Sequence, residues 1–152
     1  MSNKKHAETI VSALVALHKP GGPASSGSAY YGILSAQTLC HRLAKNSGWW
    51  TNLETGEPID ANDPLVVSQK LLLIHAEISE ACEGHRKDLM DDHLPHRKML
   101  EVELADALIR IFDTAGAMDL DLAGAVVEKL AYNQQRADHK LSNRRDGNGK
   151  RY

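Results

Sequence analysis

Hydrophobic residues recur every three to four positions along most of the chain, which is the period of an amphipathic helix. The pattern contains no convincing run of the strict alternation that indicates a half-buried strand. It therefore predicts an all-α protein, with Pro, Gly and Asp residues near the helix ends. The predicted helices are a short N-terminal one around residues 7–17, then Leu34 to about Lys45, Leu65 to about Lys87, about Pro95 to Met118, and Asp119 or Asp121 to about Asp138.

The connections between these helices predict how the helices pack. Residues 18–32 read HKPGGPASSGSAYYG and predict a flexible link, while residues 51–64 are rich in turn formers and predict a loop. The other connections are short, so most successive helices should be antiparallel. We expect an N-terminal helix and flexible link at 1–28, an antiparallel four-helix-type bundle at 29–138, and a basic flexible tail at 139–152.

Composition narrows the class of protein. The 152 residues are 25% charged and 42% hydrophobic, which suits a single soluble domain. The net charge of −2 gives no general electrostatic basis for binding nucleic acid. Cys40 and Cys82 lack CxxC spacing, and we expect both to be reduced and buried. The apolar run near the N-terminus is too short and too interrupted to cross a membrane, and no leader cleavage site follows it, so we expect a cytoplasmic protein without a membrane partner.

One stretch, EVELADALIRIFD at residues 101–113, mixes charges with aliphatic residues. At 100° per residue its charges fall in one stripe, which aliphatic residues border on both edges, unlike a simple solvated face. The stripe comprises Glu103, Asp106, Arg110 and Asp113. We expect it to lie inside the protein, where Arg110 and Asp113 could form a supporting ion pair. Glu101 points away and should be a surface residue, and a second subunit could cover the apolar face around Phe112.

The preceding helix carries a matching acidic pair. Glu77 and Glu80 lie three residues apart beside its main apolar arc, whereas Glu83 falls on the other side and should be a surface residue. In an antiparallel hairpin, Glu77 would be as far from the turn as Asp106, and Glu80 as far as Glu103. The four carboxylates should therefore converge.

Four converging carboxylates need compensation. Two like charges about 4 Å apart repel by roughly 4 kcal/mol at an effective dielectric near 20. All-oxygen ligands suit Mg²⁺ or Mn²⁺, and Mg²⁺ commonly binds together with a phosphate substrate. The alternative is an interhelical ion network of the acids with Arg110 and a lysine. A di-iron site fits less well because neither pair has the Glu-x-x-His pattern, and a zinc site at His93 and His96 has little support.

The last predicted helix supplies positive charge. Lys129, Asn133 and Arg136 occupy one of its faces at positions i, i+4 and i+7. Such a face could contact phosphate oxygens. The alternative is a cationic C-terminal turn that interacts favourably with the helix dipole.

Together these motifs resemble the MazG-like all-α nucleoside triphosphate pyrophosphohydrolases. The resemblance covers about residues 34–140. It rests on Glu77-x-x-Glu80, on Glu103-x-x-Asp106 beginning 23 residues after Glu80, and on KLAYNQQR in the last helix. Many members begin the first motif with two adjacent glutamates, where this chain has Ala76.

The resemblance implies Mg²⁺-dependent hydrolysis of (deoxy)nucleoside triphosphates to monophosphate and pyrophosphate, in nucleotide-pool control or housecleaning, by a homodimer or homotetramer. Mn²⁺ is the expected substitute ion. The implied metal ligands are Glu77, Glu80, Glu103 and Asp106, and the implied triphosphate contacts are Lys129, Asn133 and Arg136. Either Glu77 or Glu80 could accept the proton of the attacking water.

Trp49 and Trp50 are candidates to stack on the nucleobase, although they could equally pack the end of the first core helix against the bundle. Other functions stay open. A dUTPase-like or phosphoribosyl-ATP pyrophosphohydrolase is the nearest alternative. A non-catalytic helical module that binds nucleotide or partner helices through the basic tail is a further one.

Overall fold

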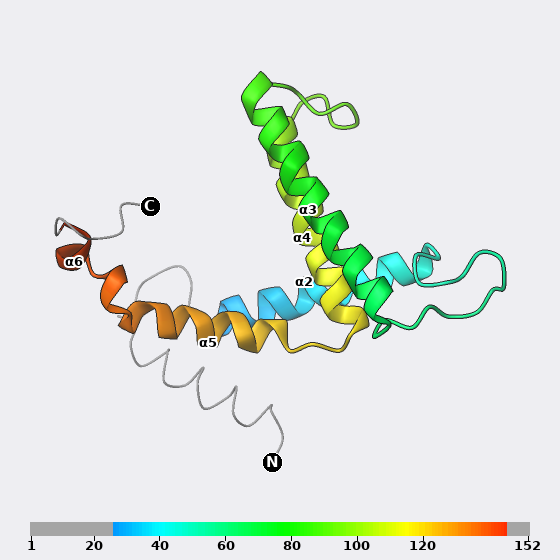
Figure 1. Cartoon of the computed structure of the whole chain (residues 1–152), viewed down its shortest axis with the longest axis horizontal. Helices are drawn as coiled ribbons and strands as arrows, with labels where there is room; N and C mark the ends of the chain where they lie inside the picture. The colour runs from blue at the N-terminus through cyan, green and yellow to red at the C-terminus, as the bar shows by residue number, and fades with distance from the viewer. Residues whose placement is uncertain (1–25, 146–152) are drawn as a thin grey trace, which may run out of the picture. The chain divides into compact units, whose positions relative to one another are not determined.

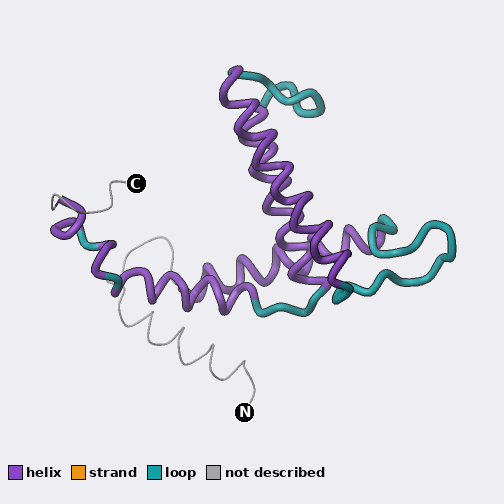
Figure 2. Tube along the Cα trace, viewed as in Figure 1, coloured by secondary structure: helices purple, strands orange, loops and turns teal. Residues whose placement is uncertain are grey.

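The computed structural model of the protein describes residues 26–145, and within them the secondary structure is helical (Figures 1 and 2). The elements are α2 (Ser26–Asn46), α3 (Pro64–Lys87), α4 (Met99–Ala117), α5 (Leu122–Gln135), a 3₁₀ turn η1 (Ala137–His139) and α6 (Leu141–Arg145). Over this part of the chain there is no strand, only two isolated β-bridges, Thr51 with Pro58 and Met90 with Lys98. The prediction of an all-α protein is confirmed. The predicted N-terminal helix and the end of the basic tail lie outside the described residues.

The chain divides into two compact units. We call Ser35–Leu120 the hairpin unit, and Met1–Leu34 together with Asp121–Tyr152 the terminal unit. The hairpin unit contains most of α2 and all of α3 and α4, and therefore all four predicted metal ligands. The terminal unit contains the start of α2 and the whole of α5 and α6.

Helix α3 begins and ends at clear local signals. The side chain of Asp63 accepts a hydrogen bond from the backbone N–H of Leu65, and Pro64 stands at the first helical position, where its missing N–H costs nothing. At the other end Asp88 adopts a left-handed conformation with φ 54°, and its N–H reaches the carbonyls of Gly84 and His85. The predicted bounds of this helix agree with the structure to within one residue.

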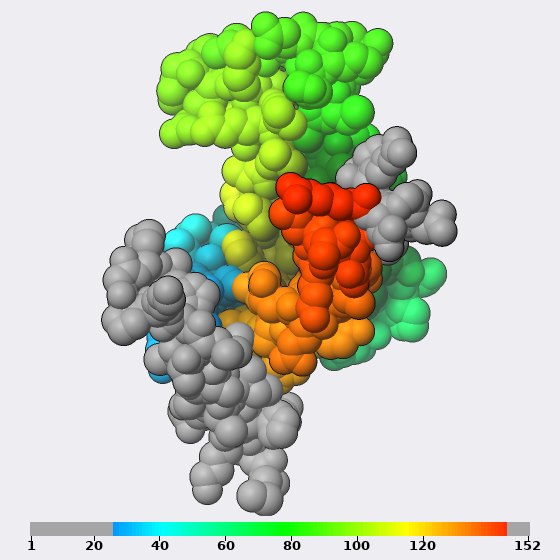
Figure 3. All heavy atoms as spheres, turned by 90° about the vertical axis from the view of Figure 1, so that its left-hand side faces the viewer, coloured from blue at the N-terminus to red at the C-terminus, as the bar shows by residue number. Residues whose placement is uncertain are grey.

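Helices α3 and α4 form the predicted antiparallel hairpin and lie side by side along their length (Figure 1). Gly84 and Met99 are equally far in sequence from the centre of the connection, and a Cβ atom on Gly84 would lie only 2.8 Å from the Met99 Cβ. The absence of a side chain at Gly84 thus lets the two helices approach closely. The space-filling view shows the hairpin as one continuous body of green and yellow-green atoms (Figure 3).

The connection between α3 and α4 corrects one predicted boundary. Helix α4 begins at Met99, not at Pro95. The backbone N–H of Asp91 donates to the Arg97 carbonyl, and the buried carboxylate of Asp91 accepts from the N–H groups of His93 and Leu94. These bonds satisfy the backbone of a turn, so the segment containing Pro95 has no need of a helix.

Helix α2 also differs from its prediction, because it begins at Ser26 and not at Leu34. Residues 26–32, expected as part of a flexible link, are helical. In the hairpin unit, Gly116 of α4 allows a close approach to α2, since a Cβ atom there would lie 2.5 Å from the His41 Cβ. Gln37 fixes the same contact by donating from Nε2 to the Leu120 carbonyl at 2.9 Å.

In the terminal unit, Asp121 caps α5 by accepting from the Gly124 N–H at 2.8 Å, as one of the two predicted caps. The helix ends at Gln135, three residues earlier than predicted. Arg136 is its extended C-cap residue, with φ −66° and ψ 134°. The prediction that Arg136 shares a helical face with Lys129 is therefore wrong, because Arg136 lies beyond the last helical residue.

Many large apolar side chains of the hairpin remain exposed. On α3 they include Leu65, Leu71, Leu72 and Ile78, and on α4 they include Leu104, Leu108 and Ile109. None of the described helices is both long enough and apolar enough to cross a lipid bilayer.

Candidate metal centre and adjoining pocket

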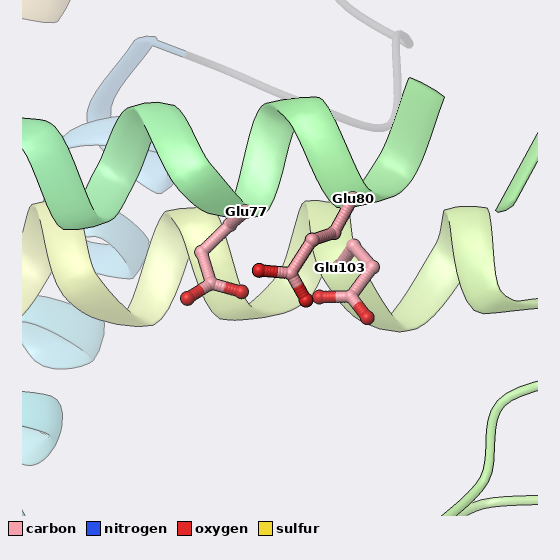
Figure 4. Close-up of side chains that lie close together, drawn as sticks. All are labelled: Glu77, Glu80 and Glu103. Carbon is pink, nitrogen blue, oxygen red and sulfur yellow. The ribbon is translucent and has the colours of Figure 1, made fainter. Parts of the chain in front are cut away.

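Three carboxylates converge between α3 and α4. Glu77, Glu80 and Glu103 each offer an oxygen such that the three atoms lie within 4.8 Å of one another. Figure 4 shows the two α3 side chains and the α4 side chain directed to the same side of the hairpin. The convergence follows from register, because Glu80 and Glu103 are equally distant from the centre of the connection.

Burial and mutual repulsion shift the protonation of this cluster. Glu77 and Glu103 are buried, at 6% and 8% exposure, whereas Glu80 is exposed. Desolvation raises the pKa of Glu103 to about 7, and a hydrogen bond to Glu77 and the negative charges of its neighbours add to this effect. Removal from water and like charges thus both act against ionisation of Glu103, which is the situation that a bound cation would relieve.

Asp106, the fourth predicted ligand, lies beside this cluster and is not one of its three members. Its pKa is raised by desolvation and by the charge of Glu77, while Arg110 opposes the shift. Arg110 donates from Nε to Glu77 Oε1 at 2.5 Å. The expected ion pair between Arg110 and Asp113 is therefore wrong, because Arg110 reaches back across the hairpin to α3.

Asp113 has different partners, which come from three parts of the hairpin unit. Its Oδ1 accepts from Trp50 Nε1 at 2.7 Å and lies 3.0 Å from His41 Nδ1. Its Oδ2 is 3.9 Å from Lys70 Nζ, and this ammonium also stands 4.2 Å from the centroid of the Trp50 ring. Asp113 is therefore a buried carboxylate compensated by donors, in contrast to Glu103.

A pocket of about 570 Å³ adjoins the acidic cluster within the hairpin unit. Its size is that of a small-molecule site, and most of its walls are apolar. Asp106 and Arg110 line it near the acids, and Lys70 and Asp113 line it two helical turns away. The remaining lining residues are Leu39, Cys40, Leu43, Ala44, Ser47, Trp49, Leu73 and Ile109.

No protein-family model, curated protein or solved structure matches this chain. The assignment of a function therefore rests on the residues and geometry of the chain itself.

The two predicted base-stacking residues have different environments. Trp50 is 6% exposed and packs edge-on against His41, so its indole is already in use inside the hairpin unit. Trp49 is 69% exposed and lines the pocket. Of the two, Trp49 is the side chain that can meet a ligand.

The three predicted phosphate-binding residues belong to the terminal unit. Lys129 Nζ lies 4.7 Å from the centroid of the Tyr132 ring, and Arg136 forms a two-point ion pair with Asp138. Asn133 Oδ1 is buried and accepts no hydrogen bond within the described part of the chain. These residues thus carry donor groups and an open acceptor, but the Arg136 guanidinium is already engaged.

The structure confirms the predicted surface glutamates but not the predicted burial of the cysteines. Glu83 pairs with Arg86 and Lys87, and Glu101 pairs with Arg97, which confirms both glutamates as surface residues. Cys40 and Cys82 are free thiols, but Cys82 is exposed and Cys40 only half-buried, so their predicted burial is wrong. Burial and then the charge of Asp113 raise the pKa of the Cys40 thiol.

Sequence reasoning missed His41 and Lys70. The sequence did contain evidence for Lys70, because Lys70 and Asp113 are equally distant from the centre of the hairpin connection. The same register argument that pairs Glu77 with Asp106 would have paired them. His41 comes from another helix, and no periodicity relates it to Asp113.

Proposed function

We propose that this chain is a Mg²⁺-dependent hydrolase that converts (deoxy)nucleoside triphosphates to monophosphates and pyrophosphate, as a MazG-like all-α pyrophosphohydrolase. The observation that carries the proposal is the convergence of Glu77, Glu80 and Glu103 within 4.8 Å, with Asp106 beside them. Partly buried carboxylates without enough counter-charge are costly in a fold unless a ligand uses them.

The donor set fits a hard divalent cation, since every converging group is a carboxylate. Glu77, Glu80, Glu103 and Asp106 would hold Mg²⁺, with Mn²⁺ as a substitute. When bound, the ion would polarise phosphoryl oxygens and lower the pKa of a coordinated water. The role of the protein is then to hold the acids in register across the hairpin.

Glu80 is the better candidate for the general base. Glu77 is buried and its Oε1 already accepts a hydrogen bond from Arg110. Glu80 is exposed and has no ion-pair partner among residues 26–145. A carboxylate that is free to reach water is the one able to take a proton from it.

The rest of the proposal concerns assembly and substrate contacts. The exposed leucines on α3 and α4 supply the kind of apolar surface that a second copy would cover, giving a homodimer or homotetramer with a four-helix bundle. Lys129, Asn133 and Arg136 would contact the triphosphate, and Trp49 would stack on the base. For Arg136, this contact requires that Asp138 release the guanidinium.

A second candidate is a non-catalytic helical module in which the acids serve structure. The Arg110–Glu77 hydrogen bond favours it, because that pair compensates one buried charge without any metal. A dUTPase-like or phosphoribosyl-ATP pyrophosphohydrolase would use the same acidic site with another substrate.

Product identification tests the proposal. The protein is incubated with each standard dNTP and NTP and with Mg²⁺, and products are separated by chromatography. We expect monophosphate and pyrophosphate, and no turnover when EDTA replaces Mg²⁺. Diphosphate with phosphate as products, or no turnover of any nucleotide, contradicts the proposal.

Two matched variants on α3 locate the activity. Glu80→Gln should lower kcat by at least about a hundredfold, the usual scale of a lost general base. Glu83→Gln removes an acid three residues further along, which pairs with Arg86 and Lys87 at the surface, and should leave kcat unchanged. Equal effects of both changes would show that the acidic cluster is not the site.

A further inference from the structure

The pocket beside the acids extends along the hairpin in a defined direction. Lys70 precedes Glu77 by seven residues on α3, and Asp113 follows Asp106 by seven residues on α4. Seven residues are two helical turns, so each pair shares a face and is separated by about 10 Å along the helix axis. A nucleotide whose phosphates meet the acids can thus place the far edge of its base near Lys70.

The walls of the pocket suit a flat ring. Leu43, Leu73 and Ile109 are aliphatic, and the Trp49 indole, 69% exposed, is available for stacking. Aromatic stacking alone accepts every base, because each base has a π-face. Any preference among bases must come from the polar groups that line the pocket.

At the end of the pocket away from the acids, Lys70 is a cation with unused donor capacity. Its side chain is 18% exposed, and its ammonium carries three N–H donors. Within the described residues its ion-pair partner is Asp113 Oδ2 at 3.9 Å, which is beyond hydrogen-bond length. Its second contact is the face of the Trp50 ring, which uses the charge but accepts no conventional hydrogen bond.

Asp113 is less able to act as an acceptor for a ligand. Its Oδ1 already faces Trp50 Nε1 and His41 Nδ1 at hydrogen-bond distance. Its Oδ2 is directed to the Lys70 ammonium. A base amino group that approached Asp113 would also meet this cation, so the balance of free polar groups favours a ligand acceptor.

We propose that Lys70 is a specificity-determining residue that selects nucleotides whose base carries a carbonyl oxygen at its outer edge, such as uracil, thymine, guanine and hypoxanthine. Its ammonium donates to that oxygen. In cytosine and adenine an amino group occupies the same position and presents its own N–H donors to the ammonium, which leaves both unpaired and is costly. The inference rests on the proposed function for the orientation of the nucleotide.

The test uses nucleosides without phosphate, in EDTA, so that neither metal binding nor turnover is needed. Deoxyuridine and deoxycytidine form one matched pair, and inosine and adenosine form another, since the members of each pair differ at the outer edge of the base. Ligand-observed NMR titration gives their dissociation constants. We expect the carbonyl member of each pair to bind about tenfold more tightly, the scale of one hydrogen bond to a charged group.

A variant then assigns the preference to Lys70. Lys70→Met keeps the aliphatic stem and should bind both members of each pair equally. Lys87→Met, which removes an exposed lysine of the same helix, should keep the preference. Circular dichroism checks that both variants are folded.

The nucleoside titration of the wild type tests the inference even if Lys70→Met fails to fold. Equal binding within each pair, preference for the amino bases, or no nucleoside binding overturns the inference. So does a preference that survives in folded Lys70→Met. If nucleosides bind with the expected preference but no triphosphate is hydrolysed, the pocket assignment stands and the proposed catalysis fails.

Discussion

Two buried carboxylates of the same helix, Glu103 and Asp113, show how neighbours decide the behaviour of a side chain. Asp113 accepts hydrogen bonds from donors and has an ammonium nearby. Glu103 faces Glu77 and Glu80, and its pKa rises to about 7. We interpret Asp113 as an internal structural acid and Glu103 as an acid that binds a ligand.

The raised pKa of Glu103 predicts how stability depends on pH in metal-free protein. The native state keeps the proton up to about pH 7, whereas the unfolded state loses it near 4.5. The unfolded state therefore binds fewer protons between these values, so the contribution of Glu103 to stability is complete below pH 4.5 and is lost as pH rises to 7. The loss from this group is about 3–4 kcal/mol at 1.4 kcal/mol per pKa unit.

Urea unfolding in EDTA at several pH values measures this effect. Glu103→Gln, which cannot ionise, should remove most of the slope and be more stable than wild type at pH 8. A wild-type stability that does not fall over this range, or a slope that Glu103→Gln leaves unchanged, contradicts the assigned protonation.

At the residue scale, sequence periodicity was enough to bring the acids together but not to find all their partners. The convergence of Glu80 and Glu103 depends on helical spacing and on the centre of one connection, and both can be read from the sequence. The partner of Arg110 could not be read, because a long side chain can reach either its own helix or the next. The contact of Trp50 with Asp113 joins a loop to a distant helix, and no local pattern encodes it.

At the scale of elements, the helices with strong end signals were predicted best. Asp63, Pro64 and Asp88 define α3, whose bounds agree to within one residue. Helix α4 lacks a side-chain cap, since Lys98 makes no capping hydrogen bond. The start of α4 is set instead by the turn around Asp91, and Pro95 misled the prediction because proline suits both a first helical turn and a loop.

The contact between α2 and α4 predicts opposite effects at two glycines. Gly116→Ala would place a Cβ atom 2.5 Å from the His41 Cβ, so it should force α2 and α4 apart and destabilise the protein by about 1–3 kcal/mol. Gly32→Ala, also inside a helix but with nothing within 4 Å, should stabilise by about 0.5–1 kcal/mol through helix propensity.

Thermal and urea unfolding of both variants measure these changes. A Gly116→Ala protein as stable as the Gly32→Ala protein would show that α2 does not pack against α4 as described.

At the scale of the whole molecule, the hairpin helices expose an apolar surface that the proposed oligomer would cover. Leu71, Leu72, Leu104 and Leu108 are each at least 45% exposed, although side chains of this kind are normally buried. Of the apolar face that the sequence predicted around Phe112, Leu108 is exposed, but Phe112 is half-buried and Gly116 packs against α2. The length and order of the helices, however, carry no information on how many copies would assemble.

Sedimentation velocity tests the predicted assembly. Wild type should sediment with twice or four times the mass of one chain. Leu104→Lys with Leu108→Lys should shift it toward the monomer, because charge at a buried apolar interface is costly. Leu53→Lys, at a 92% exposed loop position, is the matched control and should not change the mass. A monomeric wild type contradicts the proposed oligomer.

If the acids between α3 and α4 form a divalent-metal site, as we propose, Mn²⁺ should bind there, and electron paramagnetic resonance measures this binding. At pH 8 the wild type should bind Mn²⁺, and Mg²⁺ should displace it. Glu103→Gln should lose this binding, whereas Glu101→Gln, on the same helix but paired with Arg97 at the surface, should retain it. Absence of Mn²⁺ binding by the wild type, or equal binding by both variants, would show that these acids do not form a metal site.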